Sequence, residues 1–488
     1  LSRSGRGDGG EGSGRSSHTF PNPRSQSGGN IALAGVEDYM ALRQLTPTRF
    51  YRPQRAAAAA VAAGIATLAL SLAASGTAHA QDKARDAFAL KNGDRVVFYG
   101  DSITDQRMYT LLTEQYIVTR FPERDIRFVH SGWGGDRVSG GAGGPIDVRL
   151  DRDVTAYKPT VVTIMLGMND GAYKPFDESV FQAYAKGYQH IVDKLKKDNP
   201  GVRLTLIQPS PFDDVTRAPT VEGGYNTVLQ RYGLYLNGLA STANATLADM
   251  NKPVVDVLTK AKATDAANAE KIIPDRVHPG WGGHLIMAQA LLKAWNAPSL
   301  VSAVTIDATA RKATTAENAE VKNIKTAADG SLTWTATEGS LPFPIQPPDP
   351  GSAEPYNLAL ASSDFIESLN RQMLTVTNLA APSYTLKIDD QEVGTFTKEQ
   401  LAAGVNLAPL DTPMLKQAQL VAQLTRLRAN LHNARWREVQ VPRAGDKAVQ
   451  PLLPALLKDI DMAGEDLTRA QRAAAKPRPH TFTLVPKG

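Results

Sequence analysis

The sequence contains no cysteine among its 488 residues. This absence excludes disulfides, thiolate metal sites, a cysteine nucleophile and lipid attachment through cysteine. The sequence also lacks the His-Glu-x-x-His pattern of metallopeptidases and the Walker pattern of phosphate-binding loops. Metal-dependent and nucleotide-dependent activities therefore have no support in the sequence, and we expect no cofactor.

Outside the amino-terminal region the chain has almost no net charge. The chain has 54 Lys and Arg against 49 Asp and Glu, but residues 1–80 hold eight Arg and only four acidic residues. The remainder is close to neutral, which gives no electrostatic basis for a nucleic-acid partner. The content of 42% hydrophobic and 21% charged residues is typical of a globular protein, and the length favours two or three domains.

The amino-terminal region reads as a targeting segment rather than as part of a fold. Residues 1–39 are rich in Gly, Ser and Arg, and are either disordered or an over-extended translation that precedes a true start at Met40. Residues 40–80 combine a basic stretch, an apolar run and a closing Ala-His-Ala, which is typical of a bacterial-type secretory signal peptide. We expect cleavage near Ala80 and export to the periplasm or the medium; a membrane anchor is the alternative. No other segment is long and apolar enough to cross a bilayer.

Short β-rich runs and helical patterns alternate between residues 91 and 297. The expected strands cover residues 95–99, 126–129, 160–166, 203–207 and 254–255. The expected helices cover residues 109–120, 148–156, 181–197, 225–243 and 283–295. The last of these helices has an amphipathic pattern. Such alternation predicts an α/β domain with a parallel sheet and helices on both faces. Ligands of such sheets bind beyond the carboxyl ends of the strands.

Four polar loops are predicted to meet at that edge. They contain Gly100-Asp101-Ser102, residues 132–136, Gly167-Met168-Asn169-Asp170 and Asp275-Arg276-Val277-His278. Each loop alone is a common turn or helix cap, but together they supply every part that acyl transfer requires.

The chemistry follows from the residue types. A serine hydroxyl attacks well only when a base removes its proton, and the neutral imidazole of His278 can do so if Asp275 holds its other nitrogen. The backbone N–H of Ser102, the N–H of Gly135 and the side-chain amide of Asn169 are candidate donors to the oxyanion of the intermediate. Turnover should fall in acid, because a protonated imidazole cannot accept a proton.

The order Gly-Asp-Ser, Gly, Gly-x-Asn-Asp and Asp-x-x-His resembles the SGNH (GDSL) hydrolase family over about residues 91–297. The resemblance implies a flavodoxin-like three-layer α/β/α sandwich with a five-stranded parallel sheet. It also implies that Ser102 is the nucleophile, that Asp275 and His278 complete the triad, and that Gly135 and Asn169 complete the oxyanion hole. Asp101, Gly167 and Asp170 fall on the motifs as positioning residues.

One block departs from the family pattern. The family usually has an Asn before the glycine of the second block, whereas residues 130–136 here read His-Ser-Gly-Trp-Gly-Gly-Asp. The choice between Gly135 and Gly134 therefore stays open, with Gly135 favoured because Asp136 follows it. For His130 a packed or solvated position is favoured over a place in the substrate pocket, and His284 is expected near a helix start.

Residues 300–488 are predicted to form an accessory region of strands and helices. Asp329-Gly330 and Asp389-Asp390 each mark a hairpin, Thr412-Pro413 a helix start, and residues 453–474 another helix. Four leucines follow Pro413 at helical spacing and predict a buried stripe; they are Leu420, Leu424, Leu427 and Leu431. The region either binds glycan or supports the catalytic domain, and support is favoured. Trp334 and Trp436 are the candidates for sugar stacking, but core packing is the expected role of both.

The sequence thus predicts an exported serine esterase that cleaves short acyl groups, with acetyl esters on polysaccharide as the leading substrate and lipid or aryl esters as alternatives. Its expected partner is the ester substrate, with no nucleic acid and no membrane span once the signal is cleaved. The oligomeric state stays open. Two other functions also stay open: a non-catalytic glycan-binding or scaffold protein that retains the fold, and an O-acyltransferase.

Overall fold

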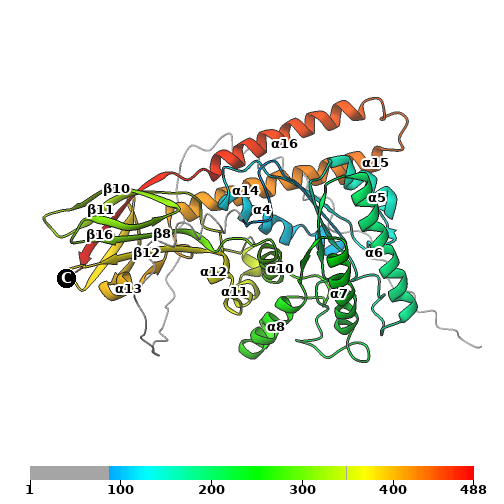
Figure 1. Ribbon diagram of the computed structural model, residues 1–488, viewed down its shortest axis with the longest axis horizontal. Coiled ribbons are helices and arrows are strands. Elements are labelled where there is room, and N and C mark those ends of the chain that lie inside the picture. The colour runs from blue at the N-terminus through cyan, green and yellow to red at the C-terminus, as the bar shows by residue number, and fades with distance from the viewer. Residues whose placement is uncertain (1–86, 348, 488) are drawn as a thin grey trace, which may run out of the picture. The chain divides into compact units, whose positions relative to one another are not determined.

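The computed structural model describes residues 87–347 and 349–487, and these belong to one compact unit (Figure 1). The predicted disordered segment, residues 1–39, and the predicted signal peptide, residues 40–80, lie outside the described residues. No helix of the described part combines the length and the apolar character that a bilayer span needs.

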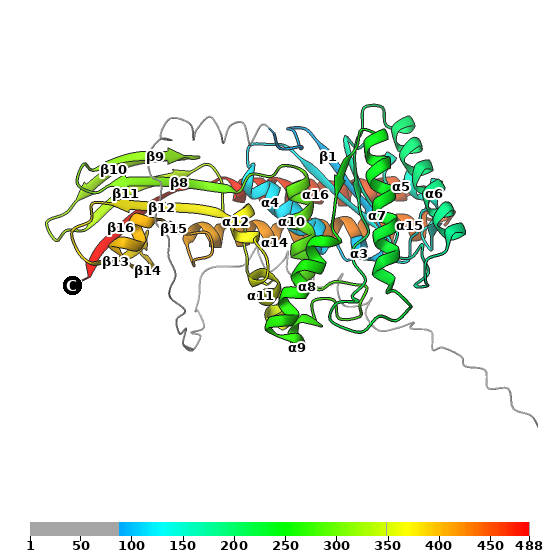
Figure 2. The same cartoon turned by 60° about the horizontal axis from the view of Figure 1, so that its bottom comes forward.

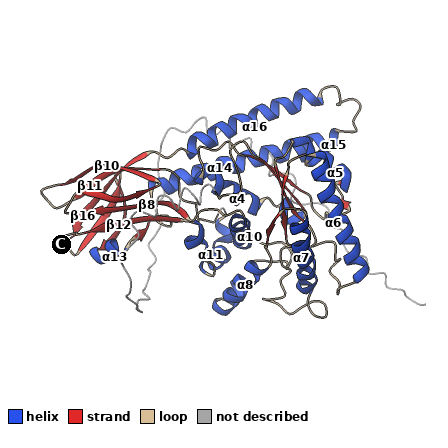
Figure 3. Ribbon diagram, viewed as in Figure 1, coloured by secondary structure: helices blue, strands red, loops and turns tan. Residues whose placement is uncertain are grey.

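A five-stranded parallel sheet forms the centre of the predicted catalytic domain. Its strands lie in the order β2-β1-β5-β6-β7 and span Arg127–Gly132, Arg95–Gly100, Val161–Met165, Arg203–Ile207 and Thr246–Ala248. Every residue of β5 is buried, as expected for a strand covered on both faces. Figure 3 shows these strands lying between helices, which confirms the predicted three-layer fold.

Helices cover both faces of this sheet. In Figure 1, α4 and α10 lie on one face, and α6 and α7 lie on the other. The helices of this part of the chain are α3 (Ser102–Asp105), α4 (Met108–Arg120), α5 (Ile146–Asp153), α6 (Glu178–Asp198), α7 (Tyr225–Thr242), α8 (Lys252–Thr264), α9 (Ala266–Ala269) and α10 (Trp281–Ala294). The predicted helices agree with α4, α5, α6, α7 and α10 to within a few residues.

The predicted strand at residues 254–255 is wrong. Val254 and Val255 lie in the first turn of α8, which Pro253 favours because proline at the start of a helix sacrifices no hydrogen bond. The fifth strand is instead β7, a half-buried edge strand of three residues with little hydrophobic signal of its own.

Helix α10 is not amphipathic as predicted, because its residues from Gly282 to Leu292 are all buried. Helix α4 packs on it from one side and α11 (Ala353–Ala361), from the carboxyl-terminal region, from another. The approach is close: a Cβ added at Gly282 would lie 2.8 Å from the carbonyl oxygen of Pro355. A segment distant in the sequence therefore covers the face of α10 that a lone domain would expose.

The carboxyl-terminal region contains two sheets, shown together in Figure 2, with strand orders β10-β11-β16-β13-β14 and β15-β12-β8-β9. Their strands are β8 (Leu300–Asp307), β9 (Lys312–Glu317), β10 (Ala319–Thr326), β11 (Leu332–Glu338), β12 (Arg371–Thr377), β13 (Ser383–Ile388), β14 (Gln391–Thr397), β15 (Val405–Asn406) and β16 (Pro479–Lys487). Both predicted hairpins are confirmed: Gly330, with φ +81°, lies between β10 and β11, and Asp389 and Asp390 lie between β13 and β14. Strand β16 lies at the centre of its sheet, so the end of the chain completes this region.

Two long helices lead from these sheets back to the catalytic domain. Helix α14 (Pro413–Asn433) begins where predicted and continues into the π-helix η3 (Ala434–Gln440), and α16 (Leu453–Ala475) returns alongside α14. The predicted leucine stripe is wrong in part, because Leu420 is 40% exposed while Val421 and Leu424 are buried. The shorter helices of this region are α12 (Phe365–Leu369), α13 (Lys398–Ala403) and α15 (Val441–Arg443).

Neither of the two tryptophans singled out for sugar stacking is available to a glycan. Trp334 and Trp436 are each only 1% exposed. The ring of Trp334 stacks on Phe482 with centroids 5.3 Å apart, and Trp436 donates its indole N–H to Asp153 of the catalytic domain. Both tryptophans pack in the interior, which is the role expected for them from the sequence.

A buried ion pair joins α14 to the catalytic domain. Glu114 of α4 is fully buried, and its carboxylate accepts hydrogen bonds from Arg428 of α14, Gln471 of α16 and the ring of His130. Burial alone would raise the pKa of Glu114, but Arg428 and His130 outweigh it and lower the pKa to about 2. Burial lowers the pKa of His130, so its ring is neutral and donates to Glu114. His130 is thus a packed residue, as favoured from the sequence.

We predict that Arg428→Met lowers the free energy of unfolding by about 3–5 kcal/mol near pH 7, because Glu114 would stay ionised and buried without its partner. Because the pKa of Glu114 is lower in the folded protein, the pair stabilises the fold above about pH 4.5 and loses its effect as the pH falls toward 2. The difference between the two proteins should therefore shrink in acid. Denaturant titrations from pH 7 downward measure it.

Arg469→Gln is the matched control. This arginine lies on α16 in an ion pair with Asp466, and its side chain is 72% exposed. The control should change the free energy of unfolding by less than about 0.5 kcal/mol. Equal losses for both variants would contradict the role assigned to the buried pair.

Candidate active site

The four polar loops lie at the carboxyl ends of the parallel strands. Gly100, the last residue of β1, is level with Gly132 of β2 and with Met165 of β5. Ser102 therefore begins α3 directly beside the loop that follows β2. Asp101 caps this short helix by accepting the N–H of Ile103 at 3.0 Å. Burial raises the pKa of Asp101 to about 7.

Ser102, His278 and Asp275 form a continuous chain of hydrogen bonds. The Oγ of Ser102 lies 2.8 Å from Nε2 of His278, and Nδ1 of the same ring lies 2.7 Å from Oδ2 of Asp275. Ser102 and His278 are 176 positions apart in the chain, yet both contacts of the triad are within hydrogen-bonding distance. The predicted meeting of hydroxyl, imidazole and carboxylate is therefore present in the structure.

The loop before α10 holds Asp275 in place. Its Oδ1 accepts the backbone N–H of Val277 at 3.0 Å and that of His278 at 2.7 Å, in a turn where Arg276 has φ +71°. Partial burial acts to raise the pKa of Asp275, but the hydrogen bonds from the backbone and ring of His278 outweigh it and lower the pKa. An ionised Asp275 accepts the Nδ1–H of His278, which leaves Nε2 free to accept the proton of Ser102.

The loop after β2 distinguishes the two candidate glycines. The N–H of Gly134 donates to Oδ2 of Asp105 at 3.1 Å, so this donor is already engaged. Gly135 has φ +77°, a conformation that favours glycine, and no described residue accepts its N–H. This difference favours Gly135 over Gly134 as a donor to substrate.

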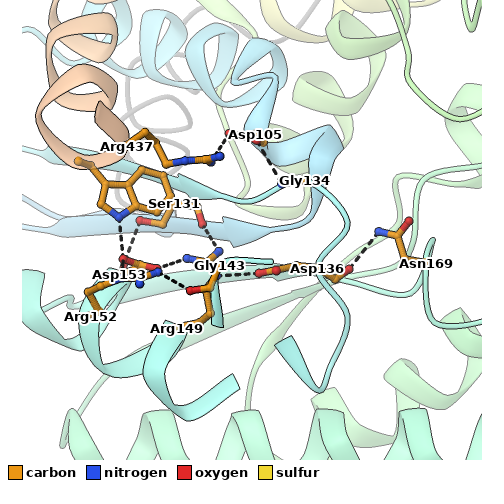
Figure 4. Close-up of polar contacts among 11 residues, drawn as sticks. Asp105, Ser131, Gly134, Asp136, Gly143, Arg149, Arg152, Asp153, Asn169 and Arg437 are labelled. Atoms are coloured by element: carbon orange, nitrogen blue, oxygen red, sulfur yellow. Dashed lines mark hydrogen bonds and ion pairs between the residues drawn. The ribbon is translucent and has the colours of Figure 1, made fainter. Parts of the chain in front are cut away.

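Asn169 is anchored with one donor left over (Figure 4). Its Nδ2 donates to the carbonyl oxygen of Asp136 at 3.0 Å, as Figure 4 shows. Its Oδ1 accepts the hydroxyl of Tyr173 at 2.9 Å. An amide nitrogen carries two hydrogens, so one remains for a ligand. Asp170 accepts the N–H of Val138 at 3.0 Å, and burial raises its pKa to about 6. It thus connects the loop of Asn169 to the segment that follows Asp136.

The contacts of His284 could not be predicted from the sequence. It lies in the first turn of α10 as expected, but it is fully buried, and burial lowers its pKa to about 3. Its Nδ1 accepts the N–H of Tyr109 at 3.2 Å, so the ring donates from Nε2 to Gln106 at 3.0 Å. His284 therefore ties the segment after His278 to the segment after Ser102. Its apolar neighbours in the sequence are the one signal that pointed to burial.

The donor set of the site can be compared with that of a metal centre. In the described ranges, no three histidine or acidic side chains converge closely enough to hold a metal ion. The arrangement instead combines a hydroxyl, a base with its carboxylate, and free N–H donors, which is a set suited to acyl transfer.

Close packing at Gly132 sets the position of α3. A Cβ added at Gly132 would lie 2.2 Å from the backbone nitrogen of Asp105 and 2.4 Å from the carbonyl carbon of Thr104. We predict that Gly132→Ala lowers the free energy of unfolding by about 1–3 kcal/mol, because backbone must move to admit the methyl group. A crystal structure of the variant should show a Ser102–His278 distance longer than the present 2.8 Å.

Gly238→Ala is the control, since an added Cβ there meets nothing within 4 Å in the exposed part of α7. That variant should keep or raise stability, by up to about 1 kcal/mol, because alanine favours a helix more than glycine does. Unchanged stability and geometry in Gly132→Ala would contradict the proposed constraint on α3.

Comparison with known proteins identifies the catalytic part of the chain. The sequence model of the GDSL-like lipase/acylhydrolase family matches residues 98–286. An acetylxylan esterase of Geobacillus stearothermophilus is 26% identical over 224 residues, which make up 41% of this chain and 94% of that protein. The solved structure of a gut microbial diltiazem-metabolizing enzyme is 27% identical, with a TM-score of 0.71. That similarity covers 82% of this chain and 100% of the other, so it extends well beyond the matched domain.

These findings agree with the order of the sequence motifs and with the sheet that presents them. The protein is an ester-bond hydrolase, and its residues 98–286 form a domain of the GDSL-like lipase/acylhydrolase family.

Proposed function

We propose that the protein is a serine esterase that works through an acyl-enzyme on Ser102. The observation that carries the proposal is the hydrogen-bond chain from Asp275 through His278 to the Oγ of Ser102, with distances of 2.7 and 2.8 Å. Each atom in it has the role that its chemistry allows: an ionised carboxylate, a ring that is held by its Nδ1–H, and a hydroxyl beside a free nitrogen.

The reaction proceeds in two halves. As the Oγ of Ser102 attacks the ester carbonyl, its proton passes to Nε2 of His278, and Asp275 stabilises the resulting imidazolium. The imidazolium then gives that proton to the departing alcohol, which leaves the acyl group on Ser102. Water attacks this acyl-enzyme with His278 again as base, and the carboxylic acid departs.

The oxyanion of both tetrahedral intermediates needs donors that are already in place. We assign this role to the N–H of Ser102, the N–H of Gly135 and the second amide hydrogen of Asn169. Donors of this kind contribute about 10²–10³ each in rate, because they are oriented before charge develops.

For the substrate we propose a short acyl ester, with acetyl groups on a polysaccharide first. The similarity to an acetylxylan esterase supports this choice, as does the nearly neutral charge of the chain after residue 80. A small-molecule ester is the second candidate, because the similarity to a diltiazem-metabolizing enzyme covers 82% of this chain. Transfer of the acyl group to a sugar hydroxyl instead of water would use the same residues.

A fluorophosphonate probe tests the nucleophile. We predict that the native protein is labelled, and that Ser102→Ala abolishes labelling and lowers kcat on p-nitrophenyl acetate by at least about 10³-fold. Ser241→Ala, an exposed serine on α7, is the control and should behave as the native protein. Labelling that persists in Ser102→Ala would eliminate Ser102 as nucleophile, and a native protein that is never labelled would favour the non-catalytic alternative.

The same proteins address the substrate. Rates on p-nitrophenyl esters from acetyl to octanoyl should fall with chain length, and acetylated xylan should release free acetate. Preference for octanoyl esters would contradict the short-chain proposal. Acetylated acceptor in place of free acetate, when a sugar acceptor is present, would establish the transferase instead.

We further propose that the protein is exported and cleaved after Ala80. The support is the basic stretch, apolar run and Ala-His-Ala ending of residues 40–80, which lie outside the described residues. When the gene is expressed in a bacterial host, amino-terminal sequencing of the periplasmic or secreted protein should begin at Gln81. An uncleaved protein in the membrane fraction would favour the anchor instead.

A further inference from the structure

The carboxyl-terminal region reaches the surroundings of the candidate active site through two adjacent residues. Trp436 and Arg437 lie in η3, the π-helical continuation of α14, far outside the family domain at residues 98–286. Irregular helical turns of this kind occur often at functional sites, because they re-aim side chains that a regular helix would direct elsewhere. Figure 4 shows Arg437 directed toward Asp105 and the loop that contains Gly134.

Arg437 is connected to the glycine loop by two contacts. Its guanidinium lies over the ring of Trp133, 3.6 Å from the centroid, and it donates to Oδ1 of Asp105 at 3.1 Å. The other oxygen of Asp105 accepts the N–H of Gly134 at 3.1 Å. Arg437 thus contacts Trp133 directly and Gly134 through Asp105, and these are the two residues that immediately precede Gly135.

Trp436 is connected to the same loop by a second set of contacts. Its indole N–H donates to Asp153 at 2.7 Å, and its ring meets Trp133 edge to face with centroids 5.5 Å apart. Asp153 pairs with the fully buried Arg149, which also donates to Asp136 at 2.8 Å. The carbonyl oxygen of Asp136 in turn accepts a hydrogen bond from the side-chain amide of Asn169. This set of contacts therefore extends to Asn169, another of the proposed oxyanion donors.

The glycine loop depends on such support, because Gly134 and Gly135 have no side chains with which to anchor themselves. An oxyanion donor must stay within about 0.5 Å of its productive position to be effective. The contacts of Trp133, Asp105 and Asp136 are therefore what keeps the N–H of Gly135 in place, and two of the three involve η3 residues directly.

We propose that Arg437 and Trp436 are positioning residues for the oxyanion hole, so that the carboxyl-terminal region supports catalysis through the loop of residues 133–136. The inference rests on the proposed function of Ser102, Gly135 and Asn169. Arg437 stacks on Trp133 and donates to Asp105 within the protein, and its side chain is only 25% exposed, which favours a role in holding the loop over one in binding substrate.

The test compares Arg437→Gln with Arg435→Gln, its neighbour two positions away on η3. Arg435 pairs with Asp461 and Gln440, which both belong to the carboxyl-terminal region. On p-nitrophenyl acetate, we predict that Arg437→Gln lowers kcat by at least about 10-fold and changes KM by less than about twofold. The upper limit is the loss of about 10²–10³-fold in kcat that follows from removal of one oxyanion donor. Arg435→Gln should stay within about twofold of the native protein in both kcat and KM. The rate of labelling by the fluorophosphonate should fall with kcat, because the phosphonyl oxygen uses the same donors.

Two further variants keep the result interpretable. Arg437→Lys retains the charge beside Asp105 but loses the planar contact with Trp133, so it should fold and show an intermediate kcat. Ser102→Ala, measured in parallel, separates the two proposals: persistent labelling in that variant, or a native protein that is never labelled, overturns the proposed function and the inference together.

Three outcomes would overturn the inference while Ser102 stands. They are native kcat in both Arg437 variants, equal losses of kcat in Arg435→Gln and Arg437→Gln, and a raised KM with unchanged kcat in Arg437→Gln. The second would indicate a structural role for η3 as a whole, and the third a direct contact of Arg437 with substrate.

Discussion

Parallel pairing of β1 with both β2 and β5 is the constraint on which the site depends. It places Gly100, Gly132 and Met165 at one level, so the loops that follow the three strands begin side by side. The same pairing requires close contact at that level, since Gly132 lies against the backbone of α3 without room for a methyl group. The sheet therefore places Ser102, the glycine loop and Asn169 close together independently of the hydrogen bonds that these residues make themselves.

The catalytic base is positioned by helix packing rather than by the sheet. His278 and Asp275 follow no strand of the sheet; they precede α10, whose buried position is set by α4 and by α11 of the carboxyl-terminal region. His284 adds a neutral, buried hydrogen bond from α10 to the segment after Ser102. The catalytic and carboxyl-terminal parts of the chain are thus packed together on two sides of the site: at α10, and at η3 beside the glycine loop. The buried ion pair of Glu114 on α4 with Arg428 on α14 joins the two parts of the chain at a third place.

Local patterns predicted the parts of the structure that depend on local physics. The order of strands and helices, the hairpins at Gly330 and Asp389, and the start of α14 at Pro413 follow from periodicity, turn residues and caps, and the structure confirms them. The predictions from local patterns were wrong where contacts with distant segments determine the structure. Val254 and Val255 carry a strand-like signal but belong to a helix, and α10 carries an amphipathic pattern but is covered on its polar side as well. Trp436 packs in the core as expected, and its partner Asp153 lies in the catalytic domain, 283 positions away in the chain.

The sequence by itself determined which groups are available for chemistry and at which edge of the sheet they stand. The absence of cysteine, the four motif loops and the spacing of Asp275 and His278 are properties of the chain, and a parallel sheet leaves one place for such loops to meet. Tertiary structure alone decided that Gly134 is engaged by Asp105 while Gly135 is not, and that Arg437 lies against Trp133. These contacts join residues about 30 and 300 positions apart, and no local pattern encodes them, because their free energy comes from burial and charge pairing that exist only once the chain has folded.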